Sequence, residues 1–80
     1  MKEIHVKAFW DSEAEVWVAT SDDVPGLVTE AGDADELIGK LRAMIPELLE
    51  ANGLLDQDEA VDIPMHISSE RTETITYRPV

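Results

Sequence analysis

The sequence contains no cysteine, few aromatic residues and few basic residues. Without cysteine, the 80-residue chain forms neither disulfide bonds nor thiolate metal sites. This composition fits a reducing compartment, and we expect the cytoplasm. No apolar run approaches the roughly 18 residues of a membrane span, and a strand-like pattern beginning at Ile4 leaves no room for a signal peptide. The length predicts a single domain over residues 1–80.

Acidic residues outnumber basic residues by 18 to 6, which gives a formal net charge of −12. Such a chain repels the phosphate backbone, so we expect no direct binding of DNA or RNA. Hydrophobic residues make up 44% of the sequence in periodic patterns, which favours a folded domain over disorder. The acidic surface either keeps the domain solvated or complements a basic partner, and the two roles are compatible.

The first 30 residues predict three strands. Apolar residues alternate with polar residues over residues 4–10 and again over residues 16–20, and the five residues between them form a hairpin loop. A third short strand over residues 27–30 follows the acidic turn from Asp22 to Gly26. In that turn Pro25 presets φ, and Gly26 supplies the positive φ of a type II turn. Short links between successive strands predict an antiparallel meander.

The periodicity then changes to that of a helix from about residue 33 to Asn52. Asp33 is a suitable N-cap with Glu36 three residues on, and Gly53 is suited to the C′ position. Pro46 predicts a kink, or a break that starts a second short helix. One face of the helix carries the apolar residues Leu37, Ile38, Leu41, Ile45, Leu48 and Leu49.

The last part of the chain predicts further strands. Residues 61–67 alternate, but Pro64 lacks an amide donor, which predicts a strand that lies at an edge or is only partly paired. Residues 68–70 suggest a turn, and residues 72–77 have high strand propensity and are a possible fifth strand. We therefore expect an α+β fold, a sheet of four to five strands with one long helix packed on one face.

A single helix leaves the other face of the sheet uncovered. If Trp10 pairs with Val16, the open face carries Phe9 and Trp17, whereas a slip of one residue places Trp17 beside Trp10. Both registers leave at least one large apolar side chain exposed, which is typical of a partner surface.

The sequence offers little for catalysis or metal binding. A two-metal nuclease needs a carboxylate on its first strand, where this chain has only Glu3 at the start. His5 and His66 become neighbours if the fourth strand pairs with the first, but with Asp62 they make only a weak metal site. No nucleophile elbow, P-loop or dinucleotide-binding motif occurs. We expect no catalytic residue, no metal, no cofactor and no enzyme activity.

The order strand, Val-Pro-Gly turn, strand and capped helix over residues 4–50 resembles the N-terminal domain of the HicB-like antitoxins. The resemblance implies a βββαβ sheet of truncated RNase H type over this single domain, with the first strand central. These 80 residues include no helix-turn-helix or ribbon-helix-helix module, so the chain looks like the short stand-alone branch of that family, whose function is mostly unassigned.

The resemblance also implies a partner, a small basic mRNA-cleaving toxin of the HicA type, which this domain would inhibit. For such an interface we expect Trp17 and then Phe9 as apolar anchors, with Asp22 and Asp23 attracting the basic partner. The small core and the open sheet face also predict a homo-oligomer. The alternative is a protein-binding or oligomerisation module with a different partner.

Overall fold

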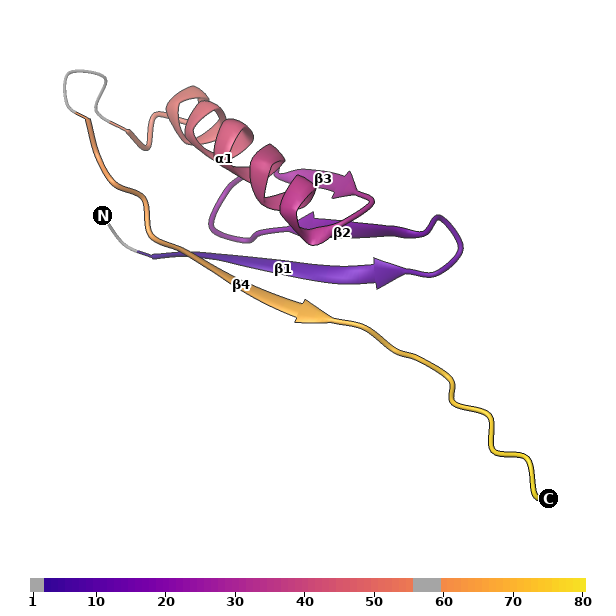
Figure 1. The fold of residues 1–80 in the computed structure, drawn as a ribbon. Helices are drawn as coiled ribbons and strands as arrows, with labels where there is room; N and C mark the ends of the chain where they lie inside the picture. The colour runs from indigo at the N-terminus through magenta and orange to yellow at the C-terminus, as the bar shows by residue number, and fades with distance from the viewer. Residues whose placement is uncertain (1–2, 56–59) are drawn as a thin grey trace.

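The computed structural model describes residues 3–55 and 60–80 and contains four strands and one helix (Figure 1). The strands are β1 (Ile4–Asp11), β2 (Val16–Thr20), β3 (Val28–Ala31) and β4 (Met65–Glu70), and helix α1 (Ala34–Ala51) lies between β3 and β4. The strand order in the sheet is β3-β2-β1-β4. The predicted α+β class is therefore confirmed.

Strand β1 lies inside the sheet, as predicted, and has a different kind of neighbour on each side. It pairs with β2 in the antiparallel sense and with β4 in the parallel sense, and β2 pairs antiparallel with β3. The parallel pair forms because α1 carries the chain back across the sheet before β4 begins. The sheet is mixed, and its two edges are β3 and β4.

The acidic turn before β3 has the predicted conformation. The Leu27 amide donates a 3.1 Å hydrogen bond to the Val24 carbonyl across Pro25 and Gly26. Gly26 has φ +84°, which a residue with a side chain adopts only with strain. Proline at the second position and a positive-φ glycine at the third define a type II turn. Val24 and Leu27, the first and last residues of the turn, are both buried, so the turn places two side chains in the core.

Helix α1 begins and ends where the sequence predicts. The Asp33 side chain accepts a 2.7 Å hydrogen bond from the Glu36 amide. At the other end, Gly53 has φ +70° and donates to the Glu50 carbonyl, while Leu54 donates to the Leu49 carbonyl. These two bonds form a Schellman motif. No helix in the described residues is both long and apolar enough to cross a bilayer.

Pro46 does not break α1, which the structure describes as one helix from Ala34 to Ala51. Of the two predicted alternatives, a kink or a break that starts a second helix, the break is therefore wrong. Pro46 lies on the exposed side of the helix, where water can hydrate the Arg42 carbonyl that it cannot serve. Buried leucine and isoleucine side chains, both before and after Pro46 in the sequence, pack against the core and stabilise the helix through this position.

The N-cap gives a first testable prediction. We expect Asp33→Ala to lower the free energy of unfolding by about 1 kcal/mol, because the Glu36 amide loses its acceptor. Asp35→Ala is the matched control, since it removes an acid from the same first turn without removing a cap, and should cost about 0.5 kcal/mol or less. Urea denaturation followed by circular dichroism measures both, and equal losses would contradict the capping role.

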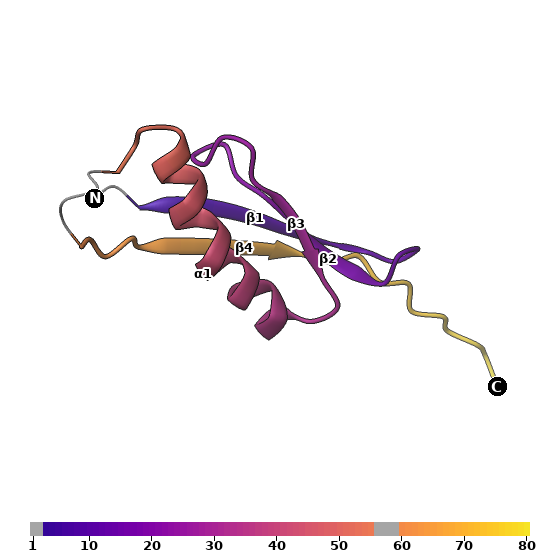
Figure 2. The same ribbon diagram turned by 90° about the horizontal axis from the view of Figure 1, so that it is seen from above.

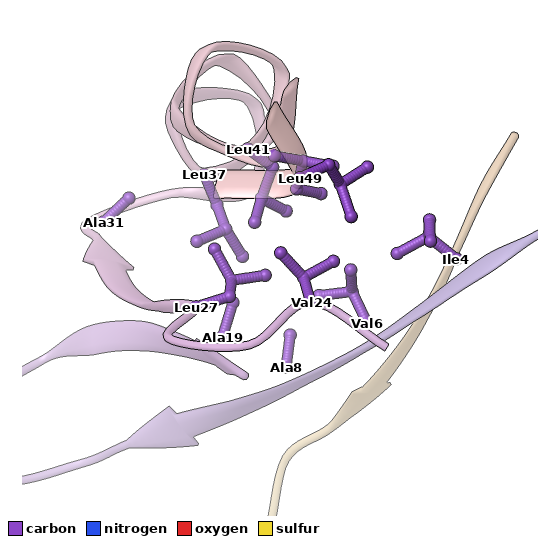
Figure 3. Close-up of a cluster of buried hydrophobic side chains, with 11 residues drawn as sticks. Ile4, Val6, Ala8, Ala19, Val24, Leu27, Ala31, Leu37, Leu41 and Leu49 are labelled. Carbon is purple, nitrogen blue, oxygen red and sulfur yellow. The ribbon is translucent and has the colours of Figure 1, made fainter. Parts of the chain in front are cut away.

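The hydrophobic core lies between α1 and one face of the sheet (Figures 2 and 3). In β1, alternate residues are buried under the helix, and their neighbours point to the other face. No polar or charged side chain is buried among the described residues. The core consists of Ile4, Val6, Ala8, Ala19, Val24, Leu27, Ala31, Leu37, Leu41, Ile45 and Leu49.

The structure decides the hairpin register. Trp10 lies opposite Trp17, with ring centroids 5.5 Å apart in an edge-to-face arrangement. This is the second of the two predicted registers, and it places both tryptophans on the helix side of the sheet. Phe9 remains on the open face with 46% of its surface exposed.

The C-terminal part of the chain differs from the prediction. Strand β4 starts at Met65 and not at residue 61, and residues 68–70 belong to it instead of forming a turn. The reason is the register of the parallel pair, which begins at Ile4 and Met65 and therefore places Lys7, Ala8 and Phe9 opposite residues 68–70. Residues 72–77 form no fifth strand within the chain, because β1 ends and turns back before they can reach it.

Candidate interaction surface

The uncovered face of the sheet is the most distinctive surface of the described residues. We call it the open face. It consists of the outward-pointing residues of the four strands, which are His5, Lys7, Phe9, Asp11, Val16, Val18, Thr20, Val28, Glu30, His66, Ser68 and Glu70. The helix packs on the opposite side (Figure 2), so no part of α1 covers these residues.

Strand pairing arranges the open face in rows. Phe9 lies opposite Val18 on β2 and beside Glu70 on β4, and Val18 lies opposite Glu30 on β3. This row, which we call the central row, therefore places two apolar side chains between two carboxylates. The next row contains the exposed Val28 at one end and Lys7 near its middle. An apolar centre with acids on both sides is suited to a partner that offers apolar and basic groups together.

The acidic turn lies at the other end of the open face. The Asp23 carboxylate accepts a 2.8 Å hydrogen bond from the His5 amide and lies 3.3 Å from His5 Nδ1. The Ser21 hydroxyl donates to the His5 carbonyl at 2.6 Å. Side chains of the turn thus continue the pairing of β1 and β2 beyond Thr20. Asp23 fixes the turn, while Asp22 is exposed and carries the charge that a partner would meet.

The four predicted interface residues are divided between two faces. Phe9 lies on the open face, and Asp22 and Asp23 lie at its His5 end. Trp17 lies on the helix side, where it is half-buried and packs against the core. The structure therefore makes Phe9 the first candidate anchor and gives Trp17 a role in packing.

The two histidines are neighbours, as the sequence suggested for a paired fourth strand. His5 lies opposite His66, and their ring centroids are 5.8 Å apart. Glu3 and Asp23 both contact the His5 ring, at 3.1 and 3.3 Å. Asp62 is not part of this cluster, because it lines a groove beside α1 with Arg42. Among the described residues, no group of three or more histidine and acidic side chains has a metal-binding arrangement.

Comparison with known proteins identifies the family. A family model for a domain of unknown function, DUF1902, matches residues 3–78. The chain belongs to the DUF1902 family. The sequence is 47% identical to that of hypothetical protein TTHA1013 from the extremely thermophilic bacterium Thermus thermophilus. The crystal structure of that protein matches the fold of this chain with a TM-score of 0.68. The alignment covers 95% of this chain and 100% of that chain. No curated protein matches the chain.

The DUF1902 assignment is less specific than the predicted family, because its description gives no function. The resemblance to HicB-like antitoxins therefore stays a prediction. The match extends to residue 78 and so includes all four strands, the helix and most of the segment after β4. The open face is therefore part of the DUF1902 domain.

Sequence reasoning missed three members of the central row, which are Val18, Glu30 and Glu70. Alternation alone placed Val18 in a strand but not on a face, because that choice depends on the register with β1. The sequence alone predicts a turn at Glu70, and only the parallel pairing with β1 places it beside Phe9. The sequence alone carries no signal for these three positions, because register depends on contacts between strands.

Proposed function

We propose that this DUF1902 domain is a non-catalytic antitoxin of HicB-like type, which binds and inhibits a small basic HicA-like ribonuclease. The observation that carries the proposal is the central row of the open face, in which Phe9 and Val18 lie between Glu30 and Glu70. The net charge of −12 supports a basic partner. The helix stripe is occupied by the core, which leaves the open face for binding.

Charge and apolar area would act at different stages of binding. The exposed carboxylates of Asp22, Glu30 and Glu70 attract a basic protein and orient it toward the sheet. Phe9, half-exposed on a rigid strand, then provides an anchor that loses little conformational freedom when it is buried. Inhibition follows if the bound sheet covers the RNA-binding surface of the ribonuclease, which is itself basic because it binds phosphates.

Co-expression with a small basic ribonuclease of the HicA-like class tests this proposal. We expect the two proteins to copurify, and we expect this chain to restore growth of cells that the basic protein arrests. A catalytically inactive form of the ribonuclease should still copurify, because inhibition requires binding and not cleavage. If the two proteins do not copurify and growth stays arrested, the alternative of a binding module with a different partner is favoured.

The acidic residues give a second prediction, on association rate. We expect Asp22→Asn combined with Glu30→Gln to slow association about threefold at low salt, with a smaller difference at high salt. Asp23 is left unchanged because it holds His5. Glu47→Gln, an exposed change on α1, is the control and should have little effect. Stopped-flow mixing at two salt concentrations measures the rates, and equal slowing by all these changes would contradict steering by the open face.

A further inference from the structure

The segment after β4 projects away from the domain. We call residues 71–80 the arm. It is extended and exposed along its whole length, and it carries the chain well beyond the end of the sheet (Figure 1). The Cα positions span 67 Å along the longest axis but only 21 and 19 Å across. Ile75 and Tyr77 in the arm are 92% and 84% exposed.

The arm has the properties of a strand that lacks a partner. Residues 72–77 alternate threonine with Glu73, Ile75 and Tyr77, and β-branched and aromatic residues favour strands. Arg71 lies over the Trp10 ring at 4.2 Å, which fixes the start of the arm to the helix side of the sheet. If the alternation of β4 continues, Ile75 and Tyr77 point to this same side. The arm cannot extend the sheet of its own chain, because β1 turns back at Asp11.

A matching edge exists on β4. Its inner side pairs with β1, and no described strand pairs with its outer side. Residues 65–70 contain no proline and no lysine, which are common protections of exposed edges. The other edge, β3, has only four residues. Strand β4 is therefore the edge that is open to another strand.

Apolar hollows lie on the helix side of this edge. One is lined by Leu41, Ile45, Ile63 and Met65, among others, and a second includes Leu37, Ile38 and Ile67. Met65 and Ile67 are only half-buried in the single chain. An added strand beside β4 would cover both side chains.

Charge favours the arm as that strand. Residues 1–70 contain 17 acidic and 4 basic residues, a net charge of −13, whereas the arm contains 1 acidic and 2 basic residues, a net charge of +1. Two copies of the acidic domain repel each other, and the arm is the part of a second copy that approaches at the lowest electrostatic cost.

We propose that two copies of this chain exchange arms, each arm pairing antiparallel with the outer edge of β4 in the other copy. Residues 65–77 then form one long strand centred near Arg71, and a two-fold axis perpendicular to the sheet relates the two long strands. This symmetry pairs odd-numbered residues with odd-numbered residues, on the helix side of both copies. Ile75 lies opposite Ile67 of the second copy, and Tyr77 lies opposite Met65 of the second copy.

This proposal goes beyond the proposed inhibition of a ribonuclease and does not depend on it. Light scattering of the purified full chain should give about 18 kDa, twice the 8.9 kDa of one chain. Ile75→Asp should give one chain mass with the circular dichroism spectrum of a folded domain. Thr74→Asp adds the same charge on the opposite side of the strand and should stay dimeric. A monomeric unmodified chain, or a dimeric Ile75→Asp variant, would overturn arm exchange.

Introduced cysteines test the pairing without removing a contact of Ile75, and the chain has no cysteine of its own. We expect Ser69→Cys combined with Glu73→Cys to form a disulfide-linked dimer under mild oxidation, because these positions lie opposite each other in the proposed register. Ser69→Cys with Thr74→Cys is the matched control, whose side chains point to opposite faces. Equal cross-linking of both pairs, or of neither, would overturn the register and the exchange with it.

Discussion

Leu41→Ala is expected to lower the free energy of unfolding by about 3–4 kcal/mol, the largest effect that we expect from truncating one side chain. Leu41 is fully buried at the centre of α1, where it packs with the core residues of the sheet (Figure 3). A domain of 80 residues has a small margin of stability, so this loss should leave a large unfolded fraction at moderate urea concentrations.

Leu54→Ala is the matched control for this prediction, because it makes the same chemical change at a residue that is 52% exposed. It should cost about 1 kcal/mol or less. Both variants are compared with the unmodified chain by urea denaturation at one fixed protein concentration, since self-association would make apparent stability depend on concentration. A Leu41→Ala loss no larger than that of Leu54→Ala would contradict the central position of Leu41.

Phe9→Ala is expected to weaken binding with little effect on stability, whereas Trp17→Ala is expected to lower stability with little effect on binding. Phe9→Ala should weaken binding of the basic ribonuclease by about 30-fold, the effect of losing a central apolar anchor, and should change stability by less than about 1 kcal/mol. Trp17→Ala should lower stability by about 2 kcal/mol, because the half-buried ring packs on the core and against Trp10. Its folded fraction should bind the ribonuclease nearly as well as the unmodified chain.

Surface-immobilised, catalytically inactive ribonuclease gives the dissociation constants, and urea denaturation of the same preparations gives the stabilities. Expressing affinity per folded molecule separates a lost contact from a lost fold. If Trp17→Ala weakens binding and Phe9→Ala does not, the helix side of the sheet is the interface and the assignment of the open face is wrong.

Arm exchange and binding on the open face use different surfaces. The exchanged arms lie along the β4 edges, with Ile75 and Tyr77 on the helix side, whereas Phe9 and Glu70 point to the other side. A dimer of the proposed symmetry would place the two open faces on the same side of one continuous sheet. Ile75→Asp should therefore abolish the dimer but leave each open face able to bind one partner.

The local structure of this protein follows from its amino-acid sequence. Pro25 and Gly26 specified the turn, because their allowed φ values match only a few turn types. Asp33 and Gly53 specified the ends of the helix, because each satisfies backbone groups through its own chemistry. Alternation over residues 4–10 and 16–20 specified two strands, although not which face of the sheet the helix covers. Of the candidate surface, Phe9 and the two aspartates of the turn were found in this way.

The choice of paired strands, their register and the number of residues they pair depend on contacts between segments that are distant in the sequence. Trp17 lies on the helix side because of the hairpin register, which depends on contacts between strands. Alternation within one strand does not report that register. Residues 68–70 form part of β4, and Glu70 lies beside Phe9, because these residues pair with Lys7, Ala8 and Phe9 of β1. Residues 72–77 have strand propensity but no partner in their own chain, since a strand forms only where another backbone completes its hydrogen bonds.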